Sequence, residues 1–188
     1  MLLRPYQEIA VSSAIDALDK HSNTVVVAPT GAGKTIMLSS LIGKRHKNNG
    51  KVLVLQHRDE LVNQNMSKFQ RVNPNISTSV VNAEAKDWSG DTVFSMVQTL
   101  SRPNNLQHMQ PMDMVVVDES HHIVADTYLR IINHAKQTNE NVEIVGFTAT
   151  PNRGDKKGLR EVFTNCSHQI EISTLIREGF LVTPKTYV

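Results

Sequence analysis

Short apolar runs alternate with amphipathic segments along the chain, and this alternation constrains the fold more than any other feature of the sequence. The predicted strands are Thr24–Ala28, Lys51–Leu55, Ile76–Val81, Thr92–Met96, Met114–Val117, Val142–Phe147 and His168–Ile172. Continuous apolar strands separated by helices are typical of a parallel sheet that is covered on both faces. The sequence therefore predicts a doubly wound α/β domain with a mostly parallel central sheet.

The segments between these strands carry apolar residues at helical spacing. The predicted helices cover Tyr6–Lys20, Lys34–His46 and Asp59–Phe69, a helix capped by Asp126 that holds Tyr128, Ile131, Ile132 and Ala135, and a short helix capped by Ser173 and ended by Gly179. Ser101–Asp113 is polar and contains a proline, so we expect a loop there.

Length and composition fit one domain that covers residues 1–188. The 20 Lys and Arg residues against 18 Asp and Glu give a net charge of +2, which excludes a polybasic protein but permits a local basic face. Cys166 is the one cysteine, so an internal disulfide and a cysteine-based zinc site are excluded, and a reducing, cytoplasmic location is favoured. We find no signal-peptide pattern and no apolar run of about 18 residues that could span a membrane.

The segment from Ala28 to Thr35 lies between a predicted strand and a predicted helix, which is the context of a phosphate-binding loop. Two glycines allow backbone angles at which successive N–H groups point at phosphate oxygens, and the helix that follows adds its N-terminal dipole. Lys34 supplies a cation for the outer phosphates, and the Thr35 hydroxyl suits a magnesium ion. The candidate nucleotide contacts are Pro29, Thr30, Gly31, Ala32, Gly33, Lys34 and Thr35.

A second chemical signal directly follows the apolar strand Met114–Val117. In open α/β sheets, ligands bind beside the carboxyl ends of the strands, where Asp118 and Glu119 are expected to lie. Asp118 suits the magnesium shell, and Glu119 suits the role of proton acceptor from an attacking water. The neighbouring His121 and His122 raise zinc as an alternative, but no zinc-protease spacing accompanies them.

These motifs, in this order, resemble the first RecA-like domain of the DExH class of superfamily 2 helicases and translocases, over about residues 3–185. Leu3–Gln7 is similar to the adenine-reading motif at the start of that domain, which implies that Gln7 bonds the adenine edge with Arg4 nearby. Asp118–His121 is similar to the DExH box. Thr148-Ala149-Thr150-Pro151 resembles the motif that couples nucleotide state to nucleic-acid grip, through Thr148, Thr150 and His121.

The resemblance also implies a nucleic-acid surface. Gln56–Leu61 is similar to one backbone-binding motif, with Arg58 at a helix start, and Thr92–Leu100 is similar to another, with Ser95, Gln98 and Thr99 as candidate contacts. Ordinary capping is the alternative for each of these residues. Thr148–Leu159 and Leu175–Lys185 resemble the repair-type and restriction-type group, which implies DNA more than RNA. Arg153, Lys156, Lys157 and Arg160 are expected to form a basic rim or a solvated loop.

Helicases of this class bind ATP between two RecA-like domains, and we find the motifs of the first one alone. The resemblance therefore implies an ATP- and Mg²⁺-binding motor domain that needs a second RecA-like domain, in cis or in trans, and that hydrolyses ATP slowly or not at all by itself. A nucleotide-dependent binding or regulatory module without turnover and an RNA-directed helicase domain remain as alternatives. A small-molecule kinase fits the adjacent Asp118 and Glu119 less well.

Overall fold

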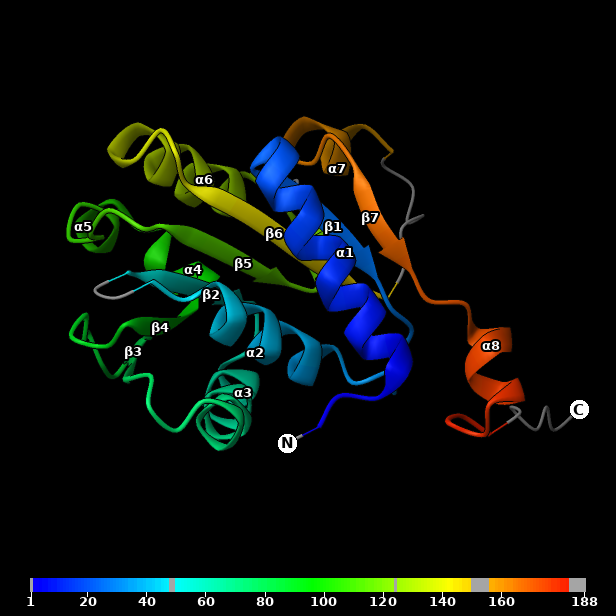
Figure 1. Ribbon diagram of the computed structural model, residues 1–188. Coiled ribbons are helices and arrows are strands. Elements are labelled where there is room, and N and C mark those ends of the chain that lie inside the picture. The colour runs from blue at the N-terminus through cyan, green and yellow to red at the C-terminus, as the bar shows by residue number, and fades with distance from the viewer. Residues whose placement is uncertain (1, 48–49, 124, 150–155, 183–188) are drawn as a thin grey trace, which may run out of the picture.

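The computed structural model describes residues 2–47, 50–123, 125–149 and 156–182, and its central sheet has seven strands (Figure 1). The strand order is β3-β4-β2-β5-β6-β1-β7, and every neighbouring pair is parallel. The strands are β1 (Asn23–Val27), β2 (Val52–Gln56), β3 (Thr78–Val81), β4 (Thr92–Met96), β5 (Met114–Asp118), β6 (Glu143–Thr148) and β7 (Cys166–Gln169). The predicted α/β architecture with a parallel sheet is confirmed.

The helices connect these strands and cover the sheet. They are α1 (Pro5–His21), α2 (Lys34–Arg45), α3 (Asp59–Val72), α4 (Val97–Leu100), α5 (Pro103–Leu106), α6 (Asp126–Thr138), α7 (Lys156–Val162) and α8 (Ile172–Arg177), with a short 3-10 helix η1 (Ser120–His122) after β5. Figure 1 shows α1, α2 and α3 crossing one face of the sheet.

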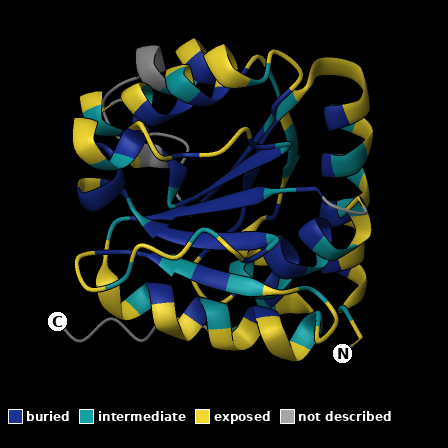
Figure 2. Ribbon diagram, turned by 90° about the vertical axis from the view of Figure 1, so that its left-hand side faces the viewer, coloured by how far each residue is buried: buried dark blue, intermediate teal, exposed yellow. Residues whose placement is uncertain are grey.

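Two apolar cores lie on opposite faces of the sheet, because successive side chains of a strand point to opposite sides. On β2, Val54 packs in the core under α1, α2 and α3, whereas Leu53 and Leu55 pack in the core under α4 and α6. The central strands β2 and β5 are buried along their whole length, and Figure 2 shows them as a dark layer between helices with exposed outer faces. Burial on both faces explains why these strands read as unbroken apolar runs.

Several local predictions differ from the structure, among them the strand predicted at His168–Ile172, which ends at Gln169 before α8 begins at Ile172. Asp126 is the first residue of α6 rather than its cap, which is Ala125, and its carboxylate still suits the positive end of the helix dipole. Ser173 lies inside α8, whose cap is Glu171. The predicted loop of residues 101–113 contains α5, which starts at Pro103 because the fixed φ of proline suits a first helical turn.

The parallel strands end at one edge of the sheet, and the chemically distinctive segments follow those ends. The glycine-containing loop follows β1, His57 and Arg58 follow β2, and Glu119 follows β5. The fold therefore gathers residues at one edge that are far apart in the sequence. In the part of the chain that the structure describes, no helix is long and apolar enough to cross a membrane.

Candidate functional site

The loop between β1 and α2 has the backbone that the sequence predicts for a phosphate cradle. Gly31 has a φ of 87° and Gly33 a φ of 81°, both in the left-handed region that favours glycine. Gly33 is the N-cap of α2, so the unpaired N–H groups of the first helical turn follow it directly. A Cβ atom on Gly33 would lie 2.5 Å from Nε2 of Gln7. The loop therefore needs glycine at position 33 both for its left-handed backbone and for the close approach of Gln7.

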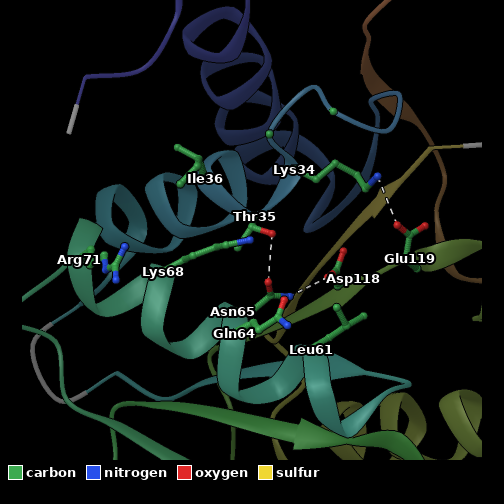
Figure 3. A pocket seen from close by; sticks show the side chains of 12 residues that line it. Lys34, Thr35, Ile36, Leu61, Gln64, Asn65, Lys68, Arg71, Asp118 and Glu119 are labelled. Carbon is green, nitrogen blue, oxygen red and sulfur yellow. Dashed lines mark hydrogen bonds and ion pairs between the residues drawn. The ribbon is translucent and has the colours of Figure 1, made fainter. Parts of the chain in front are cut away.

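Lys34 reaches across this edge of the sheet to Glu119. Its Nζ atom lies 3.2 Å from Oε1 of Glu119, and both side chains are largely buried. Glu119 itself has a φ of 55°, a left-handed conformation that costs a residue other than glycine on the order of 1 kcal/mol or more. Strain of this kind persists where the surrounding structure holds it, and here it directs the carboxylate toward the loop, as Figure 3 shows.

A buried asparagine of α3 connects Thr35 with Asp118. The Thr35 hydroxyl donates a hydrogen bond of 3.1 Å to Oδ1 of Asn65, and Nδ2 of Asn65 donates one of 3.1 Å to Oδ2 of Asp118 (Figure 3). Asn65 is 4% exposed and Asp118 is 7% exposed. The two residues that the sequence assigns to magnesium therefore lie one side chain apart, on α2 and at the end of β5.

Burial governs the electrostatics of Asp118. Loss of water raises the pKa of its carboxyl, and the neighbouring Glu119 charge raises it further, whereas Lys34 and the hydrogen bond from Asn65 act in the opposite direction. Tyr128 of α6, on the other face of β5, has its phenol pKa raised by burial and by the same two carboxylates. The site thus concentrates negative charge in a poorly solvated place, where a cation is stabilising.

The loop, the two carboxylates and α3 line an open cavity of about 520 Å³. Its lining residues are Gly31, Gly33, Lys34, Thr35, Ile36, Leu61, Gln64, Asn65, Lys68, Arg71, Asp118 and Glu119. A volume of this size is typical of small-molecule and cofactor sites, which occupy about 300–1,000 Å³. In Figure 3, Lys34 and Glu119 lie at one end of the lining, and Lys68 and Arg71 lie at the other.

The residues present suit a magnesium ion. A hydroxyl and a carboxylate are hard oxygen donors, and magnesium usually completes its shell with waters and substrate phosphates instead of a full protein cage. Among the described side chains, no group of three or more His, Cys, Asp or Glu residues gathers closely enough to hold a metal ion. A site built from Thr35, Asp118 and phosphate oxygens does not require such a group.

Gln7 and Arg4 lie where α1 begins, beside the loop. Gln7 is buried, its Nε2 donates a 3.0 Å hydrogen bond to the Ala32 carbonyl, and its Oε1 accepts one from the backbone N–H of Arg4. The hydroxyl of Tyr6 donates to the same Ala32 carbonyl. Arg4 is exposed, with its guanidinium 4.8 Å from the ring centre of Phe180. Gln7 therefore braces the loop backbone, a contact that the sequence did not indicate.

The predicted nucleic-acid residues separate into two groups. Arg58 is exposed at the N-cap of α3, and Gln98 is exposed on α4 at the same sheet edge. Ser95 is fully buried, and its hydroxyl donates a hydrogen bond to the Val81 carbonyl of the neighbouring strand. Thr99 is 6% exposed. Ser95 faces the interior because β4 is covered on both sides, and Thr99 is buried on α4, so neither side chain is exposed for contact with a nucleic acid.

The predicted coupling residues are described only in part. Thr148 is buried at the end of β6, beside the β1 strand that leads into the loop. His121 lies in η1, and its side chain is outside the described residues, as are Thr150, Pro151 and Arg153 and the side chains of Lys156 and Lys157. The structure adds one contact that the sequence did not indicate: the rings of His57 and His122 lie 4.7 Å apart, between the end of β2 and η1.

Comparison with known proteins identifies the family. The family described as "Type III restriction enzyme, res subunit" matches residues 1–153. This chain belongs to that family. The chain is also similar to "Putative ATP-dependent helicase IRC3" of Saccharomyces cerevisiae, with 28% identity over 98% of this chain and 28% of that protein. A second relative, "ATP-dependent DNA helicase MPH1" of Pyricularia oryzae, is 27% identical over 92% of this chain and 16% of its own length.

A solved structure shows the same fold. The crystal structure of the Hef helicase domain of Pyrococcus furiosus superposes with a TM-score of 0.77 at 24% identity, covering 94% of this chain and 39% of that one. The fold is the RecA-like N-terminal domain of superfamily 2 helicases, as the sequence motifs implied. This chain spans less than a third of the lengths of the helicases IRC3 and MPH1 named above.

Proposed function

We propose that this chain is the ATP-binding motor domain of a DNA helicase or translocase. The observation that carries the proposal is the meeting of Lys34 and Thr35 with Asp118 and Glu119 on one cavity. These pairs are more than 80 positions apart in the sequence, and only the fold brings them together. A phosphate cradle, a cation and two carboxylates at one edge are the parts that phosphoryl transfer from ATP requires.

Each residue has a role that its position supports. Thr35 and Asp118 would hold a magnesium ion, which neutralises charge on the phosphates when bound. Lys34 binds the outer phosphates, and the backbone N–H groups of Gly31, Gly33 and Lys34 would donate to phosphate oxygens. The N–H of Ala32 already donates to the Pro29 carbonyl. Glu119 accepts a proton from the water whose oxygen forms the new bond to phosphorus, while the bond to the ADP oxygen breaks. Arg4 is exposed beside the loop and would lie near the adenine. The contact of Gln7 with the adenine edge stays a prediction, because its side chain is buried and its amide is engaged by the Ala32 carbonyl and the Arg4 N–H.

The proposal predicts that Lys34→Ala weakens binding of a fluorescent ATP analogue by about tenfold or more, since a charge-assisted contact to phosphate contributes about 1.5–3 kcal/mol. Lys44→Ala is the matched control, because Lys44 lies on the same helix and makes an exposed ion pair with Glu8. Equilibrium fluorescence titration of both variants measures the effect. Equal affinities of the Lys34→Ala variant and the wild type would show that the cavity is not an ATP site.

We assign the nucleic-acid partner to DNA on the similarity to a relative that is called a DNA helicase. Arg58 and Gln98, exposed at the sheet edge that carries the loop, are the contacts that the structure supports. A helix N-terminus with an adjacent cation suits a phosphate of the strand and does not read sequence. Competition between single-stranded DNA and RNA of one sequence tests the choice, and stronger competition by RNA would reverse it.

A second RecA-like domain is the protein partner that completes the proposal. Such a domain would face the sheet edge that carries Lys34 and Glu119 and would contribute an arginine toward the transferred phosphoryl group. The support is the short span of this chain within its helicase relatives. Under this proposal the 188-residue chain binds nucleotide but turns it over slowly.

A further inference from the structure

Asn65 lies at the nucleotide site, but none of the sequence motifs includes it or assigns it a role. It lies on α3, which begins just after Arg58, and its side chain lines the cavity while remaining 4% exposed. Both polar atoms of its amide are engaged, Oδ1 by the Thr35 hydroxyl and Nδ2 by the Asp118 carboxylate. A buried amide costs free energy unless it is hydrogen-bonded. Here its two partners are the two proposed magnesium ligands.

The direction of each hydrogen bond determines what the ligands can offer. A threonine hydroxyl has one proton and two lone pairs, and this one donates its proton to Asn65, so its lone pairs stay available to a cation. Asp118 receives an N–H on Oδ2, which fixes the carboxylate plane and leaves Oδ1 without this partner. One amide therefore orients both oxygen donors at the same time.

We infer that Asn65 is a positioning residue for the cation site, holding Thr35 and Asp118 in the orientation that a nucleotide-bound magnesium ion requires. The inference rests on the proposed function, because it concerns the same site. Outer-shell partners of metal ligands set ligand orientation, and their loss usually lowers metal affinity by about 10- to 100-fold. Asn65 also compensates for the burial of Asp118, since its hydrogen bond favours the ionised carboxylate that binds a cation.

The test measures magnesium affinity separately from catalysis. Binding of a fluorescent ATP analogue is followed while Mg²⁺ is titrated, for the wild type and for Asn65→Leu, which keeps most of the side-chain volume and removes both hydrogen bonds. We expect the half-saturating Mg²⁺ concentration to rise by about 10- to 100-fold in the variant. Nucleotide affinity in excess chelator should remain at the wild-type level, because Asn65 acts through the cation ligands.

Two further variants separate positioning from packing. Asn65→Ala removes the amide without adding a branched side chain, so it should show the same rise if hydrogen bonding is the cause. Asn73→Leu is the matched control, since Nδ2 of Asn73 donates a 2.8 Å bond to the Ser39 carbonyl and joins the end of α3 to α2 away from the cavity. This control should keep the wild-type dependence on Mg²⁺.

The outcomes distinguish the inference from the function on which it rests. An unchanged half-saturating concentration in both Asn65 variants overturns the inference, and a lower one also overturns it, because it would show that the amide occupies the place of the cation. A wild-type chain that binds no nucleotide, with or without Mg²⁺, overturns the proposed function and the inference together. Magnesium-dependent binding by the wild type keeps the function, whatever the variants show.

Discussion

Gly33 shows how a single missing side chain supports the site. Its left-handed backbone disfavours any residue with a Cβ, and a Cβ there would also lie 2.5 Å from the amide of Gln7. A Cβ atom at this position would therefore be disfavoured twice, by backbone strain and by a clash with the buried side chain of Gln7. The close approach lets Gln7 reach the Ala32 carbonyl at 3.0 Å. The two effects can be separated experimentally, because Gly179 also has a left-handed backbone but has no described atom near the position of an added Cβ.

We predict that Gly33→Ala lowers the free energy of unfolding by about 2–4 kcal/mol, of which backbone strain accounts for about 1–2 kcal/mol and the clash with Gln7 for the rest. Gly179→Ala is the matched control, since Gly179 has a φ of 75° and a Cβ added to it would meet no atom of the described residues within 4 Å. Urea denaturation of both variants measures the difference. Equal losses in the two variants would show that the contact with Gln7 has no energetic importance.

The residues of the site differ in how far the sequence could predict them. Lys34, Thr35 and Asp118 stand in local patterns next to recognisable strands, so their chemistry could be inferred directly. Asn65 is 30 positions from one partner and 53 from the other, and an asparagine within a helix has no spacing that indicates such partners. Ser95 is a candidate nucleic-acid contact through the resemblance of Thr92–Leu100 to a backbone-binding motif, but a strand that is covered on both faces buries its side chain.

At the scale of elements, the ends of β2 and β5 are connected by a pair of histidines. His57 follows β2 directly before Arg58, and His122 belongs to η1 after Glu119, with their ring centres 4.7 Å apart. Burial lowers the pKa of His57, and the charges of His122 and Arg58 lower it further, while Glu119 raises it. The contact between His57 and His122 therefore joins the proposed nucleic-acid residue Arg58 to the nucleotide-site residue Glu119. The surroundings of His57 in this contact disfavour its protonation.

This contact predicts a pH dependence of stability. Folding lowers the pKa of His57, so the unfolded chain binds the proton more readily than the folded chain. The contribution of His57 to the free energy of unfolding is therefore fully present above the pKa of the unfolded chain, about 6.5, and is lost as the pH falls below it. We expect the fall in Tm between pH 7.5 and pH 5.5 to be smaller in His57→Gln than in the wild type. Differential scanning fluorimetry over a pH series measures it, with the exposed His108→Gln as control. A fall in His57→Gln as large as that of the wild type would contradict the assignment.

The type and order of the strands and of the longer helices were predictable because each of these segments carries its own periodicity. Element ends were less predictable, as α6 shows, because Ala125 and Asp126 differ by one position and the cap is decided by the chain that enters the helix. The four-residue helices α4 and α5 lie in segments with no helical repeat long enough to detect. The sequence therefore could not predict the local backbone geometry where one helix or strand leads into the next. These connecting segments include the ends of β2 and β5, where His57 contacts His122.

At the scale of the whole molecule, the cavity of about 520 Å³ is built on one sheet edge and is lined by α2, α3 and the end of β5. Phosphoryl transfer is accelerated by about 10³- to 10⁵-fold when an arginine reaches the transferred group. Under the proposed function, that arginine belongs to a second RecA-like domain that faces this edge. Under the same proposal, the 188-residue chain supplies the residues for nucleotide binding and proton transfer, and the second domain would supply the arginine.

We predict that the 188-residue chain hydrolyses ATP at less than about 10⁻² s⁻¹, since a typical enzyme turnover of about 10 s⁻¹ would be reduced by 10³-fold or more without the arginine. Phosphate release in a steady-state assay measures the rate, with saturation confirmed by the fluorescent analogue. Glu119→Gln in the same chain is the control that assigns any residual turnover to this site. A rate near 10 s⁻¹ that disappears in Glu119→Gln would show that the chain completes its own catalytic site, and the exposed Arg71 of α3, which lines the cavity, would then be the residue to examine.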